Sequence, residues 1–162
     1  VYGDVVAGVK VNSIATLNVK TTGVVNVAGT KATVKIETVN IEKGVSKSGV
    51  LTANNIVLGD INNNGTLDGT FSVDGTFEQN GTADAAVITL TKQTDKEGNE
   101  IAHAILKVNV DMNTAGITNN GEVIIMKKLT GKIQNNAVIT VNGTLEETAA
   151  VDIEEAEVAI RQ

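Results

Sequence analysis

Residues 59–69 read Gly-Asp-Ile-Asn-Asn-Asn-Gly-Thr-Leu-Asp-Gly, the densest combination of turn residues and oxygen-bearing side chains in the chain. The spacing Asp-x-Asn-x-Asn-Gly-x-x-Asp matches most of a calcium-binding loop. Phe71 occupies the place of the final bidentate glutamate, so a helix-loop-helix EF-hand is excluded. The stretch therefore predicts a tight turn between two strands. This turn either binds calcium or needs no metal, because Asn-Gly is also a favourable hairpin turn.

If the turn binds calcium, its spacing defines a set of candidate ligands. Four would act through their side chains and Thr66 through its backbone carbonyl, while the last ligand would come from elsewhere. The net charge of −6 is compatible with recruitment of divalent cations. The candidate metal ligands are Asp60, Asn62, Asn64, Thr66 and Asp68.

The composition of the whole chain predicts an all-β protein. Valine, isoleucine and threonine dominate, asparagine and glycine punctuate the chain, and proline is absent. The 162 residues suit one domain with a core of its own. Alternating segments predict strands near residues 14–19, 24–28, 32–41, 50–58, 70–78, 123–129, 137–141 and 151–160.

The arrangement of these strands has two interpretations. Residues 85–93 and 100–111 predict an antiparallel hairpin joined by the polar connection 94–99. Asn-Gly pairs begin at Asn64, Asn80, Asn120 and Asn142, at unequal intervals, whereas a solenoid repeats at a fixed period. We therefore expect residues 1–162 to form a single antiparallel β-sandwich of jelly-roll type, with a parallel β-solenoid as the alternative.

Composition also excludes several classes of function. A net charge of −6 with only 13 basic residues argues against nucleic acid, whose phosphates require a basic patch. Aromatic residues make up 2% of the chain, too few for a platform that stacks bases or sugars. No run is long and apolar enough to span a membrane, and cysteine is absent. A start at Val1 fits a secreted chain after signal-peptide removal, although a trimmed chain would look the same.

The N-terminal residues 1–12 form an extended segment with small apolar side chains. Val5, Ala7, Val9 and Val11 share one face. The segment is either the first strand of its own sheet or a donor strand that inserts into the next subunit. Burial of these side chains at roughly 1.5 to 3 kcal/mol each could hold a polymer together.

Catalysis is not expected. The chain has one histidine, His103, which falls on the polar side of its strand and lacks recognisable catalytic partners. It has no His-Glu-x-x-His motif, nucleophile elbow, phosphate loop or dinucleotide fingerprint. The acidic C-terminal strand, residues 151–160, suits a solvated sheet edge, or a cation-bridged contact between subunits.

Three of the Asn-Gly pairs continue as Asn-Gly-Thr, the acceptor pattern for N-glycosylation. Asn80 and Asn142 are the better candidates. A glycan on Asn64 would prevent that side chain from binding calcium.

Two segments resemble camelysin- and TasA-like secreted proteins. Residues 14–20, Ile-Ala-Thr-Leu-Asn-Val-Lys, resemble the Gly-Thr-Leu-Asp-Leu-Lys-Val segment of that family, with Ala15 in place of its glycine. Residues 62–73 resemble its Asn-x-Gly-Thr/Ser-Leu-Asp turn, although the family's Pro-Gly-Asp turn is absent. The resemblance implies a secreted jelly-roll subunit that polymerises by strand exchange. The acidic, proline- and cysteine-free chain is also similar in character to subunits of cannulae, the calcium-dependent extracellular tubes of hyperthermophilic archaea.

These observations lead to a hypothesis about function. We expect a secreted structural glycoprotein that forms a head-to-tail homopolymer, such as an extracellular filament, tube or biofilm-matrix fibre. Donor-strand exchange would join the subunits and calcium would stabilise them. The alternative is a cell-surface adhesin or binding module that does not polymerise.

Overall fold

The computed structural model describes residues 13–29, 34–147 and 157–160, and these contain strands and no helix. Thirteen strands form one sheet in which every neighbouring pair is parallel. The strands of this sheet are β1 (Ser13–Val19), β2 (Val24–Ala28), β3 (Lys35–Ile41), β4 (Val50–Asn63), β5 (Thr66–Val73), β6 (Thr76–Gln79), β7 (Val87–Leu90), β10 (Ile105–Val108), β12 (Gly116–Asn119), β13 (Glu122–Ile125), β15 (Ile133–Asn135), β16 (Val138–Val141) and β18 (Glu157–Ile160).

Two smaller sheets complete the described part of the chain. The first is parallel and contains β11 (Met112–Asn113), β14 (Lys128–Gly131) and β17 (Thr144–Glu147). The second is an antiparallel pair formed by β8 (Lys92–Thr94) and β9 (Glu100–His103). The protein is therefore all-β as expected, but the predicted antiparallel jelly-roll sandwich is wrong.

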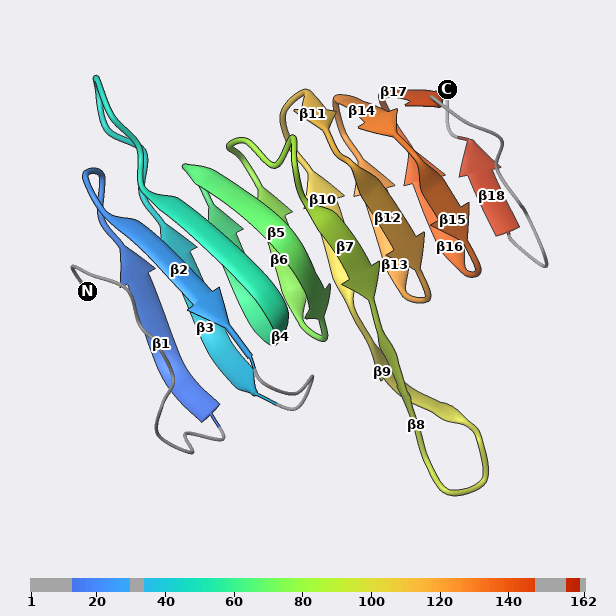
Figure 1. Ribbon diagram of the computed structural model, residues 1–162. Helices are drawn as coiled ribbons and strands as arrows, with labels where there is room; N and C mark the ends of the chain where they lie inside the picture. Colours follow the sequence, from blue (N-terminus) through green and yellow to red (C-terminus); the bar gives the residue numbers. More distant parts are fainter. Residues whose placement is uncertain (1–12, 30–33, 148–156, 161–162) are drawn as a thin grey trace.

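The strands stack coil upon coil, as Figure 1 shows. Asn63 lies beside Gln79, and Asn119 beside Asn135, and both pairs are separated by 16 residues. The alternative expectation of a parallel solenoid agrees with this stacking in part. The long strand β4 joins two of the stacks, because it pairs with β5 along its first part and with β6 near its end, so that one sheet wraps round the core.

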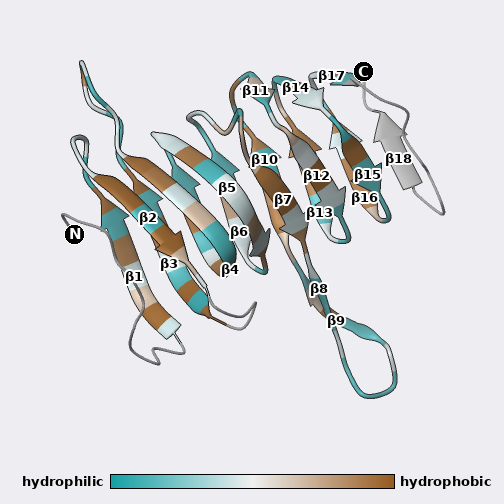
Figure 2. Cartoon of the chain, viewed as in Figure 1, coloured by the Kyte–Doolittle hydropathy of each residue, from teal (hydrophilic) through white to brown (hydrophobic). Residues whose placement is uncertain are grey.

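Side-chain alternation within the strands builds the core (Figure 2). Because the strands are parallel and in register, each buried position lies beside the buried position of the next coil. Each such side chain contributes about 1.5 to 3 kcal/mol through removal from water. One ladder of almost fully buried residues runs through Leu17, Val39, Ile61, Phe77, Leu106, Val123 and Ile139.

Two pairs of fully or almost fully buried amide side chains occupy corners of the coils. Asn63 Nδ2 donates to Gln79 Oε1 at 2.9 Å, and Asn119 Nδ2 donates to Asn135 Oδ1 at 2.7 Å. Burying such groups is costly unless they are hydrogen-bonded. Among the described residues, every buried side-chain nitrogen and oxygen has a partner.

The antiparallel pair β8–β9 is an excursion from one corner of the stack. The amide of Ala104 donates to the carbonyl of Thr91 at 2.8 Å, which closes the base of the hairpin. The predicted connection 94–99 joins these two strands. The predicted antiparallel pairing of the arms 85–93 and 100–111 is confirmed only where they adjoin the connection, at Lys92 with His103 and Gln93 with Ala102. It is wrong for the rest of the arms, because β7 and β10 each pair in parallel with strands of other coils.

Candidate functional site

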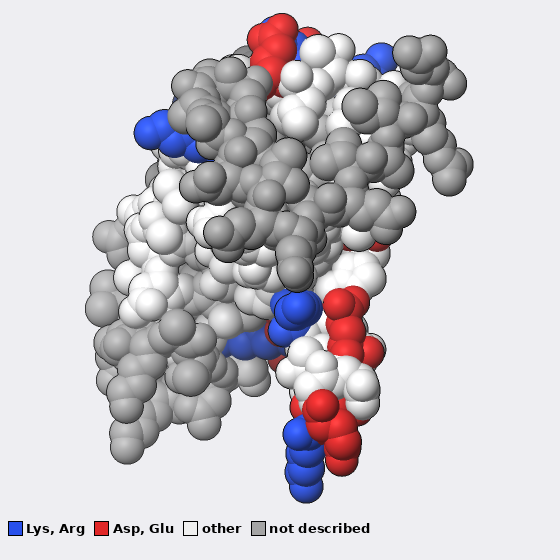
Figure 3. All heavy atoms as spheres, turned by 90° about the vertical axis from the view of Figure 1, so that its right-hand side faces the viewer, with Lys and Arg blue, Asp and Glu red and all other residues white. Residues whose placement is uncertain are grey.

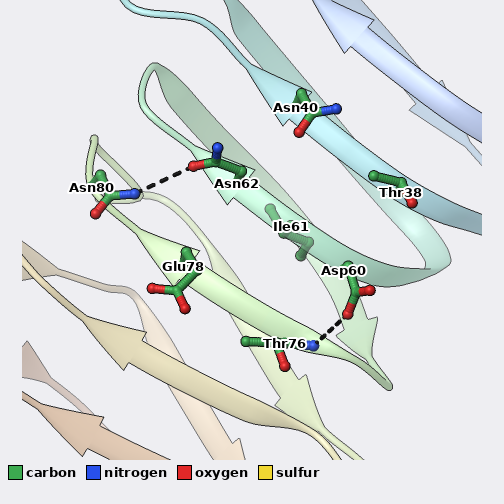
Figure 4. A pocket seen from close by; sticks show the side chains of 8 residues that line it. All are labelled: Thr38, Asn40, Asp60, Ile61, Asn62, Thr76, Glu78 and Asn80. Atoms are coloured by element: carbon green, nitrogen blue, oxygen red, sulfur yellow. Dashed lines mark hydrogen bonds between the residues drawn. The ribbon is translucent and has the colours of Figure 1, made fainter.

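A shallow hollow lies over the outer face of β3, β4 and β6 (Figure 4). Its volume of about 280 Å³ is just below the range typical of sites for small organic molecules. The side chains that line it are almost all polar and uncharged or acidic. They are Thr38, Asn40, Asp60, Ile61, Asn62, Thr76, Glu78 and Asn80.

Strand alternation positions these side chains. In β4, Ile61 and Asn63 are buried, and the intervening Asp60 and Asn62 are exposed on the outer face. Parallel pairing places Thr38 beside Asp60, and Asn62 beside Glu78. The register of β3, β4 and β6 therefore forms the hollow, because it aligns two rows of polar side chains across three successive coils.

The predicted calcium residues do not form a single loop. Residues 60–63 continue strand β4, and β5 begins at Thr66. Asp60 Oδ1 accepts a hydrogen bond from the amide of Thr76 at 2.9 Å. Asn62 Oδ1 accepts from Asn64 Nδ2 at 3.1 Å and from Asn80 Nδ2 at 3.3 Å. The structure therefore brings Asp60, Asn62 and Asn64 together along one side of the stack.

The other two predicted ligands lie beyond the corner, in β5. Thr66 pairs with Val50 and forms a bridge with Thr82, and Asp68 pairs with Thr52. Asp68 Oδ1 accepts a hydrogen bond from the amide of Ala85 at 3.3 Å. Within the described residues, no three His, Cys, Asp or Glu side chains lie close enough together to form a metal-binding group.

Glu78 and its neighbours determine the electrostatics at one side of the hollow. Lys107 Nζ lies 2.7 Å from Glu78 Oε1, and Asn109 Nδ2 donates to Glu78 Oε2 at 2.9 Å. The hydrogen bond from Lys107 is the main cause of a lowered pKa at Glu78. Asp60 has no ion-pair partner among the described residues. Its carboxylate is thus the uncompensated charge of the hollow.

A second charged cluster lies near the hollow, where Lys35 Nζ is 2.8 Å from Glu37 Oε2 and 2.9 Å from Asp74 Oδ2. These two hydrogen bonds raise the pKa of Lys35. The lysine therefore remains protonated and balances the carboxylates around it.

The sequence motif found only part of this hollow and missed Thr38, Asn40, Thr76 and Glu78. A repeated triplet would have found them, in which two polar residues flank a buried apolar residue. The triplets are Thr16-Leu17-Asn18, Thr38-Val39-Asn40, Asp60-Ile61-Asn62 and Thr76-Phe77-Glu78, and they lie beside one another in the sheet.

The remaining candidate residues lie elsewhere. Asn80 is half-buried at the end of the hollow and accepts a hydrogen bond from Asn109 Nδ2 at 3.0 Å, whereas Asn142 is exposed. His103 lies on the hairpin, with Nδ1 2.7 Å from Glu100 Oε1 and Nε2 3.7 Å from Glu122 Oε2. The predicted donor-strand residues of the segment 1–12, and most of the acidic strand 151–160, lie outside the described residues.

Comparison with known proteins identifies no relative. No protein-family profile, curated protein or solved structure matches the chain. Within the described residues, no helix is long and apolar enough to cross a membrane.

Proposed function

We propose that this chain is a secreted structural protein, a parallel β-solenoid segment that assembles with copies of itself into an extracellular filament or tube. The observation that carries the proposal is the in-register parallel pairing from β1 through β16 to β18. A stack of this kind presents at each end the same backbone pattern that joins its internal coils, so further coils can be added.

Strand β1 is the edge at which such addition is proposed. Within the described residues, β1 pairs only with β3. The carbonyl of Val19 accepts a hydrogen bond from the amide of Glu42, so the backbone of Val19 faces β3. Alternate residues of a parallel strand present their backbone groups to opposite sides, and the backbone of Asn18 therefore faces away from β3.

Residues 1–12 would act differently in a stack of coils than in a jelly roll. In a jelly roll, Val5, Ala7, Val9 and Val11 would fill a groove left by a missing strand. In a stack of coils, the same segment would extend a neighbour's sheet by pairing with its edge strand, which is still donation of a strand between subunits. If one end of each copy pairs with the opposite end of the next copy, the assembly is head-to-tail and the polymer does not close.

The edge can be tested with two substitutions at one position. Asn18→Pro removes the backbone donor that faces away from β3, and Asn18→Ala removes the side chain but retains that donor. Light scattering and negative-stain electron microscopy would measure assembly, and circular dichroism would verify the fold. We expect polymers for the native chain and Asn18→Ala, and loss of polymers for Asn18→Pro. Equal assembly of both variants would contradict addition at β1.

A deletion of residues 1–12 tests strand donation separately. We expect the shortened chain to fold but not to assemble. A deleted chain that polymerises like the native chain would exclude the segment as the connecting strand.

Calcium is the second part of the proposal, now centred on Asp60 and Asn62 in the hollow. The exposed carboxylate of Asp60 and the amide oxygens beside it are hard oxygen ligands of the type that calcium prefers. Isothermal titration with calcium should give binding that Asp60→Asn weakens and the matched variant Asp68→Asn leaves unchanged. An equal loss of calcium affinity in both variants would favour the five-ligand loop that the sequence predicted. Absence of calcium binding to the native chain would contradict this part of the proposal.

A surface adhesin or binding module remains the alternative function. The observation that favours it is the row of polar side chains on the outer face, which could contact a partner without polymerisation. A monomer at all protein concentrations, with and without calcium, would favour this alternative over the filament.

A further inference from the structure

Within each buried amide pair, the two members form different hydrogen bonds to the backbone two residues later. In the first member of each pair, the side-chain oxygen accepts a hydrogen bond from the amide two residues later. Asn63 Oδ1 accepts from the amide of Gly65 at 3.1 Å, and Asn119 Oδ1 accepts from the amide of Gly121 at 3.0 Å. Both glycine amides are thereby held inside the stack.

The second member of each pair behaves in the opposite way. Its side-chain oxygen already accepts a hydrogen bond from the first member, so its nitrogen donates to the carbonyl two residues later. Gln79 Nε2 donates to the carbonyl of Gly81 at 2.9 Å, and Asn135 Nδ2 donates to the carbonyl of Ala137 at 3.0 Å. Within the described residues, the amides of Gly81 and Ala137 have no hydrogen-bond acceptor.

This difference matters because of the chemistry of Asn-Gly pairs. The amide nitrogen of the glycine can attack the side-chain carbonyl of the asparagine, since glycine offers no side chain to hinder the approach. A new C–N bond closes a succinimide ring and ammonia leaves. Water then opens the ring to give aspartate or isoaspartate. A glycine amide held by a hydrogen bond to an acceptor is a poorer nucleophile for this step.

Four Asn-Gly pairs in the chain can be compared on this basis. The amides of Gly65 and Gly121 donate to buried asparagine side chains, and the amide of Gly143 donates to the carbonyl of Ile125 at 3.0 Å. Only the pair Asn80-Gly81 follows a second member, so only its glycine amide has no acceptor in the described structure.

Restraint of the asparagine side chain does not explain the difference. Asn80 donates to Asn62 and accepts from Asn109. The side chain of Asn64 also donates to Asn62, and that of Asn120 donates to the carbonyl of Leu90 at 3.2 Å. Asn120 also accepts from Asn136 Nδ2 at 2.9 Å, so Asn80 and Asn120 both donate and accept, whereas Asn64 only donates. The side chain of Asn80 is therefore no freer than the other two, and the glycine amide is the feature that separates the three sites.

We propose that Asn80 is a site of spontaneous deamidation in the folded protein, selected because Gln79 leaves the Gly81 amide without an acceptor. Aspartate at this position adds a carboxylate to the hollow beside Glu78, and the donation from position 80 to Asn62 is lost. Isoaspartate lengthens the main chain at a corner where the amide of Thr82 donates to the carbonyl of Gly65 at 2.8 Å. Both products alter the hollow, and isoaspartate also perturbs the stacking of the two coils.

The experiment follows deamidation at each site in the folded chain during incubation at mildly alkaline pH. Peptide mapping by mass spectrometry detects the mass gain when the amide becomes a carboxyl, and isoaspartyl methyltransferase labelling detects isoaspartate. We expect Asn80 to react roughly two- to tenfold faster than Asn64 and Asn120, the factor that corresponds to one net hydrogen bond. Asn142 should react at an intermediate rate. Its side chain is exposed, and the amides of Asn142 and Gly143 both donate to the carbonyl of Ile125, so the hydrogen bond that holds the Gly143 amide is shared.

The variant Ala137→Gly provides a matched gain of reactivity. It creates an Asn-Gly pair at positions 136 and 137, directly after Asn135, which is the second member of its amide pair. The neighbouring coil has Asn120-Gly121 at the same corner, and there the glycine amide donates to Asn119. Ala137 is half-buried, and removal of one methyl group should preserve the fold. Asn136 in this variant should react about as fast as Asn80. In denaturant, Asn64, Asn80 and Asn142 should react at equal rates, because each is followed by Gly-Thr.

Two outcomes would overturn the proposal. The first is a folded chain in which Asn80 reacts no faster than Asn64 and Asn120. The second is an Ala137→Gly variant in which Asn136 reacts as slowly as Asn120. Hydrogen exchange provides an independent measurement, because the Gly81 amide should exchange faster than the amides of Gly65 and Gly121.

Discussion

Strands β9 and β10 are equal in length and separated by one residue, but their surroundings are opposite. Every side chain of β9 is exposed, whereas β10 alternates between half-buried and fully buried residues. Figure 3 shows acidic and basic side chains gathered on the projecting part of the molecule, which carries the hairpin. Both segments are strands, so the comparison separates strand formation from the effect of coil stacking.

The comparison shows that the in-register ladders bury the apolar side chains, whereas the hairpin leaves them exposed. Leu106 in β10 contacts the buried residues of two neighbouring coils through Phe77 and Val123. Ile101 in β9 is similar in size and 64% exposed. We therefore expect the hairpin to open or change its sequence without disturbing the core.

The largest expected difference comes from truncating these two aliphatic residues. Leu106→Ala should lower the free energy of unfolding by about 2 to 5 kcal/mol, because it leaves a cavity in the ladder. Ile101→Ala should change it by less than about 0.5 kcal/mol, as for other exposed positions. Urea denaturation followed by circular dichroism measures both. Equal effects would mean that the hairpin packs against the stack in solution.

Buried and exposed asparagines provide the next comparison. Asn119→Ala removes the acceptor of the Gly121 amide and the donor to Asn135 and to the carbonyl of Val138, and should cost about 2 to 4 kcal/mol. Asn99→Ala removes an exposed hydrogen bond to Asp95 at the hairpin tip, and should cost about 0.5 kcal/mol. Denaturation curves with unchanged slopes would validate the comparison, and a small effect of Asn119→Ala would show that the corner relaxes.

Removal of the hairpin should have a smaller effect. Replacement of residues 92–103 by a short glycine-containing turn, as at Asn120-Gly121 on the next coil, should change the unfolding free energy of the stack by less than about 1 kcal/mol. The shorter loop has a smaller closure entropy, and the hairpin residues bury little. Thermal unfolding would measure this. A large loss of stability would show that the hairpin is needed to join the two coils.

The smallest expected effect concerns pH. The lowered pKa of Glu78 means that its pairing with Lys107 stabilises the fold above the usual glutamate pKa of 4.5. This contribution is lost as the pH falls through the lowered pKa of the folded state. The pair is partly exposed, so the change should not exceed about 0.5 kcal/mol. Denaturation at neutral and acidic pH should show a smaller difference in Glu78→Gln than in the native chain, and an identical difference would exclude the pair as a contributor.

The strand pattern was predictable because it is local. The expected strand at 24–28 coincides with β2, and the expected strand at 50–58 lies within β4. The turn 94–99 was also predicted, from polar residues between two β-forming segments. Alternation of side chains along a strand depends only on neighbours in sequence, and it also places Asp60 and Asn62 on one outer face.

The pairing of strands was not predictable from the same pattern. Unequal Asn-Gly intervals argued against a repeating stack, but three of the pairs share one corner, at Asn64, Asn80 and Asn142, and Asn120 belongs to another. The inserted hairpin lengthens one coil, and other coils have Asn109 or Met126 at the shared corner. The interval therefore varies although the stacking does not.

The sequence by itself determined the β class, the positions of most strands and turns, and the polar triplets from which the hollow is built. The tertiary structure decided parallel over antiparallel pairing, the register of the coils, and the separation of Asp68 from Asp60. The physical reason is that strand formation and alternation depend on neighbouring residues, whereas the choice of partner depends on which distant apolar faces can be buried together.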